Sequence, residues 1–167
     1  MIKKLIPMTL ALLTTISPNV NARVKAHGLA GSSSDPKNPF HVSLGISLAR
    51  GLGESFYVGL DSNLLLETTN YEISYALDLE QKLKDYSFGL GIGFSRIHMD
   101  EPIHVSSGTV KEPIPEESFL IRPYLTRSIT NRLRLISAYT RNFADIELHD
   151  KDYPQHRFSL GLGVVLK

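Results

Sequence analysis

Large apolar residues alternate with small or polar residues along most of this chain, which is the period of a β-strand with two unlike faces. The clearest run begins at Tyr86 and ends at Ser95: every even position is large and apolar, and every odd position is Gly or Ser. The same alternation marks residues 40–48 and 158–166, and a less regular form marks residues 56–66, 71–79, 119–125 and 133–143. The sequence therefore predicts an all-β protein with at least seven strands.

The connections between these runs are of two kinds. Short turns are predicted at residues 51–54, 82–85 and 128–131, and long polar connections at residues 32–39, 100–117 and 144–155, with one short link at 68–70 on the same side as the long ones. The clearest runs are about 10 residues long, which suits a tilted strand that crosses a bilayer. Short turns on one rim and long loops on the other are typical of outer-membrane barrels, whose turns are periplasmic and whose loops are extracellular.

A closed barrel of this kind has an even number of strands, with both ends of the chain at the periplasmic rim. The best candidate for the eighth strand is residues 23–30, which precede the first long connection. A strand within residues 100–117 is the alternative, made less favourable by Pro102, Pro113 and Pro115, because proline cannot donate to a strand ladder. The expected fold is an antiparallel up-and-down transmembrane β-barrel, with eight strands as the favoured number.

The N-terminal residues have the order of a secretory signal peptide. Lys3 and Lys4 are followed by an uncharged apolar run from Leu5 to Ile16, and the segment Val20-Asn21-Ala22 then suits cleavage after Ala22. Residues 1–22 are therefore predicted to be a cleaved signal peptide that directs export, and residues 23–167 a single barrel domain in the bacterial outer membrane. The chain has no cysteine and a formal net charge of +1, so it offers neither a disulfide framework nor a basic surface for nucleic acid.

Alternation alone does not say which face of the barrel is inside. Glycines such as Gly89, Gly91 and Gly93 solvate nothing on a water-facing exterior, but they leave space in the crowded lumen of a narrow barrel. We therefore expect the apolar face to point to lipid; the alternative is a soluble periplasmic lipocalin-like barrel, with its faces reversed. The charged side chains expected in the lumen are Asp61, Glu67, Glu72, Asp78, Glu80, Arg122, Arg132, Arg134 and Arg157.

These charges include both signs, so an internal ion-pair network is expected. Eight strands enclose only enough room for side chains, which favours a plugged interior over a diffusion pore. Aromatic residues near the strand ends are expected to form the girdles found at the two membrane surfaces. They are Phe40, Phe56, Tyr71, Tyr86, Phe119, Tyr139 and Phe143.

Three features of the chain together carry a resemblance to a known family: the signal peptide, residues 128–135 (SITNRLRL) leading to Ala138-Tyr139-Thr140, and the last strand, residues 157–166 (RFSLGLGVVL). In these features the sequence resembles the small eight-stranded outer-membrane barrels of the OmpA and OmpX type. We expect a non-enzymatic barrel that acts as membrane scaffold or surface contact, mainly through residues 100–117 and 144–155. Its expected partners are outer-membrane lipid and lipopolysaccharide, the barrel assembly machinery, and a host or protein ligand at the cell surface.

The main alternative is a lipid A-modifying hydrolase. The pattern His-Val-Ser occurs at His41 to Ser43 and at His104 to Ser106, and on a strand it puts a base and a nucleophile on one face. The lipid A deacylases resemble this chain in size, but their His and Ser lie on the next-to-last strand, where this chain has Ala138-Tyr139-Thr140. A weaker hypothesis, acyl transfer, combines Asp61-Ser62 with His41. The six histidines show no strong metal-site spacing, so we expect no catalytic, cofactor-binding or metal-binding residues.

Overall fold

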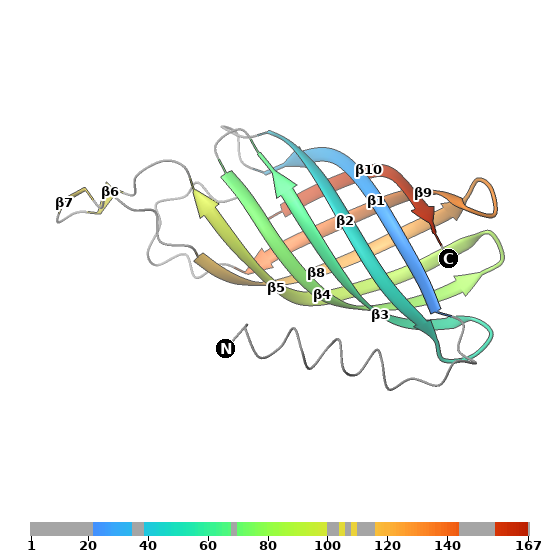
Figure 1. The fold of residues 1–167 in the computed structure, drawn as a ribbon. Helices are drawn as coiled ribbons and strands as arrows, with labels where there is room; N and C mark the ends of the chain where they lie inside the picture. Colours follow the sequence, from blue (N-terminus) through green and yellow to red (C-terminus); the bar gives the residue numbers. More distant parts are fainter. Residues whose placement is uncertain are drawn as a thin grey trace.

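Eight long strands pair edge to edge into a closed antiparallel barrel (Figure 1). The structure, a computed structural model, describes residues 22–34, 39–67, 70–99, 104–105, 108–109, 116–143 and 156–166. The strands are β1 (Ala22–Ser33), β2 (Phe40–Gly51), β3 (Phe56–Leu66), β4 (Asn70–Leu83), β5 (Tyr86–Met99), β6 (His104–Val105), β7 (Gly108–Thr109), β8 (Glu116–Ser128), β9 (Leu133–Phe143) and β10 (His156–Val165). Among the described residues, no helix is long and apolar enough to cross a membrane.

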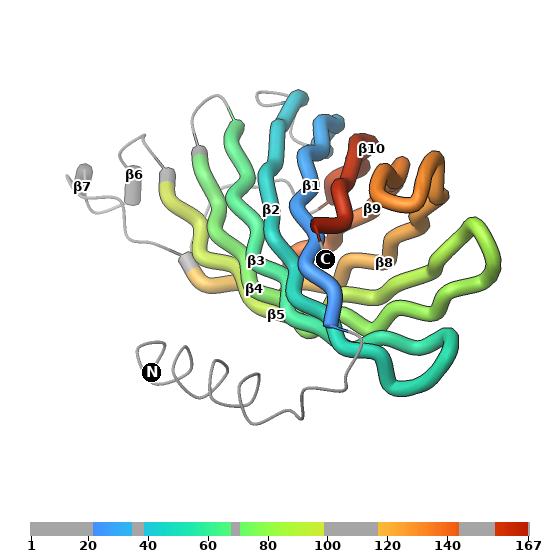
Figure 2. The backbone as a smooth tube through the Cα atoms, turned by 45° about the vertical axis from the view of Figure 1, so that its right-hand side comes forward, coloured from blue at the N-terminus to red at the C-terminus, as the bar shows by residue number. Residues whose placement is uncertain are grey.

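The barrel closes where its first strand meets its last. β1 pairs with β10 from Lys25 opposite Val165 to Ser33 opposite Arg157, and it pairs with β2 along its other edge. Figure 2 shows β1 lying between these two strands. The predicted eighth strand is thus confirmed, with wider bounds than residues 23–30. The alternative is wrong, because β6 and β7 pair only with each other and stand outside the barrel.

The three predicted short turns all lie at one end of the barrel. Lys84 and Asp85 join β4 to β5, and Lys84 has a positive φ of 54°, the left-handed conformation that two-residue hairpins use. The turn between β8 and β9 is closed by Thr130, whose hydroxyl oxygen accepts a hydrogen bond from the Leu133 N–H at 3.0 Å. We call this the short-turn end and the opposite one the long-loop end. The predicted loops 100–117 and 144–155 lie largely outside the described residues.

Inward and outward side chains alternate along every long strand, with the apolar face outside. On β5, Phe94 is 68% exposed, whereas its neighbour Ser95 is 2% exposed and faces the lumen. Outward positions of the other strands carry large apolar side chains such as Phe40, Ile46 and Leu160, while most buried side chains are polar or charged. A soluble barrel requires the reverse distribution, so the lipocalin-like alternative is wrong.

Candidate functional site

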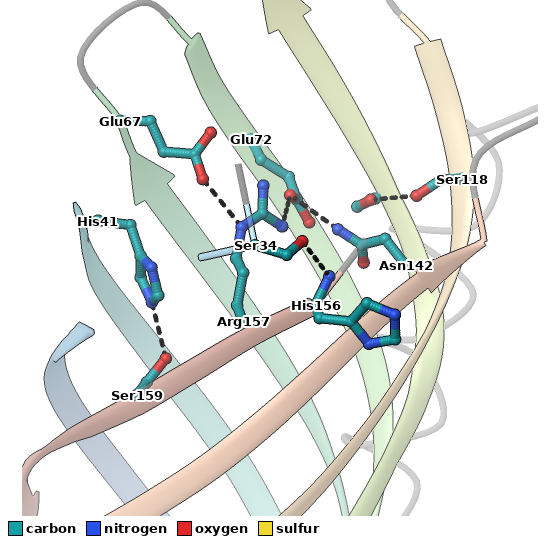
Figure 3. A network of polar contacts seen from close by, with 10 residues as sticks. Ser34, His41, Glu67, Glu72, Ser118, Asn142, His156, Arg157 and Ser159 are labelled. Carbon is teal, nitrogen blue, oxygen red and sulfur yellow. Dashed lines mark hydrogen bonds and ion pairs between the residues drawn. The ribbon is translucent and has the colours of Figure 1, made fainter. Parts of the chain in front are cut away.

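The lumen is filled by a polar network, and its part at the long-loop end is centred on Arg157 of β10 (Figure 3). The Arg157 guanidinium contacts Glu67 Oε1 at 2.9 Å through Nε and Glu72 Oε2 at 2.6 Å through Nη1. Asn142 Nδ2 donates to the same Glu72 oxygen at 3.2 Å. Arg157 and Glu72 are almost completely buried. These contacts therefore tie β10 and β9 to the start of β4 across the interior.

The other half of the network lies toward the short-turn end. Lys25 of β1 forms an ion pair with Glu80 of β4, and Arg134 Nη1 lies 3.7 Å from the second oxygen of Glu80. Deeper in the barrel, Arg122 forms a hydrogen-bonded ion pair with Asp61 and lies 3.9 Å from Asp78. Buried charges are costly unless paired. Each of these groups has an opposite charge nearby, so the lumen contains the internal ion-pair network that the sequence predicted.

Two details of this network differ from the sequence prediction. Arg132 is exposed in the turn between β8 and β9, so its assignment to the lumen is wrong: β8 ends at Ser128, and alternation resumes only at Leu133. Lys25 and His27 lie in the lumen but were missed. Most outward residues of β1 are small, so the strand lacks the alternating large apolar residues that predicted the other strands. The signal that marks its inward face is the basic residue at every second position, Arg23, Lys25 and His27.

The glycines of the inward face make room for large side chains from neighbouring strands, as predicted. The Tyr124 ring occupies the space where a side chain at Gly89 would stand, and the His27 ring does the same at Gly45. A cavity of about 50 Å³ remains, lined by Asp78, Arg122 and other residues of the network. That volume holds only a few water molecules, at roughly 10–15 Å³ each. The geometry is that of a packed interior.

The candidate enzyme residues whose side chains the structure describes do not form an accessible catalytic site. His41 and Ser43 do share the inward face of β2, but both are buried, and His41 Nε2 lies 2.8 Å from Ser159 Oγ of β10 (Figure 3). Asp61 faces the lumen while Ser62 faces outward, so the acyl-transfer pair is split between the two faces. The side chains of His104 and Ser106 lie outside the described residues. Within the described part of the chain, no three acidic or histidine side chains gather to hold a metal ion.

The predicted aromatic residues face outward at both ends of the barrel. Five of them lie at the long-loop end of their strands, and Phe56 and Tyr86 lie at the short-turn end. Phe119 contacts the rings of Phe94 and Phe143, each with a centroid separation of 5.8 Å. An apolar outer band flanked by aromatic rings is the surface that a bilayer covers.

The apolar exterior and the polar, filled lumen distinguish a membrane barrel from a soluble one. This chain has the fold of the small eight-stranded outer-membrane barrels. The N-terminal barrel domain of Pseudomonas aeruginosa OprF matches with a TM-score of 0.56 and 11% identity, covering 87% of this chain and 98% of that one. Ail, the attachment invasion locus protein of Yersinia pestis, matches with a TM-score of 0.56 and 10% identity, covering 87% and 97%.

Neisserial surface protein A has the same barrel fold, with a TM-score of 0.54 and 14% identity over 87% of this chain and 96% of that one. No protein-family model and no curated protein matches the sequence. At these identities the likeness shows the fold alone. The role of the loops does not follow from it.

Proposed function

We propose that this protein is a non-enzymatic barrel of the bacterial outer membrane, a scaffold that holds surface loops for contact with other molecules. One observation carries the proposal: the apolar side chains form the outside of the barrel and the ion pairs fill the inside. Such a surface suits a bilayer, which shields it from water. Side chains of the described residues crowd the lumen, which disfavours diffusive transport of solutes, so the rim and the long loops are the parts that we expect to carry function.

Export and insertion are part of the proposal. Residues 1–22 act as a signal peptide cleaved after Ala22, and the barrel assembly machinery inserts the remaining chain. The support is the order of residues at the N-terminus. The short-turn end then faces the periplasm, and the long-loop end faces outward, as the loop lengths of such barrels require.

The contact role rests on residues 100–117 and 144–155, with lipopolysaccharide, a host surface or another protein as partner. The names of two proteins with this fold support the idea: one is an attachment invasion locus protein and the other a surface protein. Ail is also known in complex with the heparin analogue sucrose octasulfate. A rigid, filled barrel is a suitable base for such loops.

Fractionation of Gram-negative cells that express the full chain tests this proposal. We expect a mature chain that begins at Arg23, is found with the outer membrane, and migrates faster on a gel when unheated than when boiled. Recovery in the soluble periplasm without detergent would contradict it. Lipid A from the same cells should keep its mass. If lipid A loses an acyl chain in cells that express the unaltered protein but not in cells that express His41→Ala, the result would support the hydrolase instead.

A further inference from the structure

A cationic and aromatic cluster lies on the outer surface of β9 and β10 at the long-loop end. Arg141 is exposed and stands directly opposite His156 in the pairing of the two strands. The Arg141 guanidinium carbon lies 4.7 Å from the centre of the Phe143 ring. Both polar heads therefore sit on the outward face, close to the rim, with aromatic surface beside them.

The His156 ring is held in place by two contacts. Its Nδ1 lies 2.5 Å from the Tyr139 hydroxyl, and the two rings stack with centroids 6.0 Å apart. Ser34 fixes the backbone at the start of β10, because the His156 N–H donates to Ser34 Oγ at 3.3 Å and the Ser34 N–H donates to the His156 carbonyl at 2.9 Å. We infer that the Tyr139 hydroxyl donates this hydrogen bond, which leaves the His156 ring proton on Nε2. His156 then offers an N–H donor on the outward face, on the residue that pairs with Arg141 across the strands.

The surface beside these donors is apolar and aromatic. The rings of Phe143, Phe119 and Phe94 contact one another in sequence across β9, β8 and β5, because these residues are partners in the strand register. Phe94 lies five residues from the long-loop end of β5, whereas Phe143 is the last residue of β9. The aromatic row thus descends from the rim into the part of the exterior that lipid chains cover.

We propose that this cluster binds a phosphorylated lipid of the outer leaflet. The phosphate accepts hydrogen bonds from Arg141 and His156, and the acyl chains pack along Phe143, Phe119 and Phe94. Guanidinium suits phosphate because it donates in a planar fork. The cation–π contact with Phe143 orients the guanidinium without neutralising its charge. The inference rests on the proposed function, since it needs the long-loop end to lie in the outer leaflet.

A second outward arginine at the same end provides a matched control. Arg96 of β5 also lies near the rim and is exposed, but its partner across the strands is Glu117, which is exposed on the same face. A carboxylate beside the guanidinium repels a phosphate. Arg141 has Ile121 and His156 as its cross-strand partners instead. The proposed lipid therefore binds at Arg141 and not at Arg96.

The test is a lipid titration of the refolded mature barrel in zwitterionic detergent, with bound lipid counted by native mass spectrometry. The probe is bisphosphorylated lipid A, compared with the same lipid after removal of its phosphates and with the phosphorylated disaccharide that lacks acyl chains. We expect one lipid A per barrel and about tenfold weaker binding in Arg141→Gln, the loss of one charge-assisted hydrogen bond. Arg96→Gln should bind as the unaltered barrel does, and the two other probes should bind much more weakly.

Several outcomes would overturn the site. They are unchanged affinity in Arg141→Gln, an equal loss in Arg96→Gln, equal binding of the dephosphorylated lipid, and equal binding of the soluble disaccharide. Heat-modifiable migration of each variant confirms that its barrel is folded. A barrel that fractionates with the outer membrane but shows one of these outcomes retains its proposed function and loses only this site.

Discussion

The ring of Tyr124 on β8 lies over Gly89 on β5, so that a Cβ atom at Gly89 would stand 2.0 Å from Tyr124 Cζ. The two residues are direct partners in the strand pairing. The inward tyrosine fills the space that the glycine leaves open. An eight-stranded barrel has little interior width. The large inward side chain of Tyr124 therefore needs a glycine opposite it on the neighbouring strand.

Gly89→Ala should therefore destabilise the barrel. Overpacking of a filled interior typically costs about 1–3 kcal/mol, measured by urea unfolding of the barrel in phospholipid vesicles. The control is Gly53→Ala in the turn between β2 and β3, where a Cβ would meet nothing within 4 Å. In a Tyr124→Ala background the cost of Gly89→Ala should fall. Equal stability of the two single alanine variants would mean that the lumen is not packed as described.

Arg157→Met should strongly destabilise the barrel. The substitution removes the buried cation that contacts both Glu67 and Glu72, and removing one partner of a buried ion pair costs about 3–5 kcal/mol in other proteins. Arg132→Met is the control, because Arg132 is exposed in a turn and should stay within about 0.5 kcal/mol of the unaltered barrel. The same unfolding measurement checks both. A larger effect at Arg132 would restore its predicted place in the lumen.

Ile92→Arg should destabilise the inserted barrel by about 2–4 kcal/mol, because it places a charge against lipid near mid-membrane. Ile92 lies in the middle of β5 on its outward face, 40% exposed. The control is Leu52→Arg in the turn between β2 and β3, where Leu52 is 66% exposed. The free energy of unfolding in vesicles should be unchanged in the control variant. If the two variants are equally stable, the outward face of β5 is not covered by lipid.

Protease added to intact cells tests the orientation. Cleavage is expected within residues 100–117, and the turn at Lys84 and Asp85 should be spared because it faces the periplasm. Mass spectrometry of the fragments identifies the cut. Cleavage at the short turns alone would show that the barrel is inserted the other way.

The alternation of residues predicted most of this fold, because each barrel strand carries its two environments in its own sequence. β3 and β9 begin and end at the predicted residues. β1 was inferred only from the need to close the barrel. Most of its outward residues are small, because lipid accepts alanine and glycine there, so the alternation of large apolar residues that marks the other strands is weak. Arg132 shows the opposite error, since a turn shifts the register and alternation cannot be carried through it.

The sequence could not predict which side chains contact each other across the lumen. Arg157 was correctly placed inside, but nothing in its own strand says that it meets Glu72, which lies 85 residues away. That pairing depends on the tilt and stagger of all the strands. The pairing of His41 with Ser159 has the same origin. Sequence patterns thus predicted most of the charged residues that enter the lumen and left their contacts open.

The central claim is that the apolar face meets lipid, and one fluorescence measurement tests it most directly. The chain has no cysteine, so Ile92→Cys and Leu52→Cys each introduce a single site for a fluorescent label. In vesicles, the label at residue 92 should be quenched by lipids brominated on their acyl chains and not by aqueous iodide, and the label at residue 52 should show the reverse. Quenching of the label at residue 92 by iodide, with no effect of brominated lipid, would contradict the account.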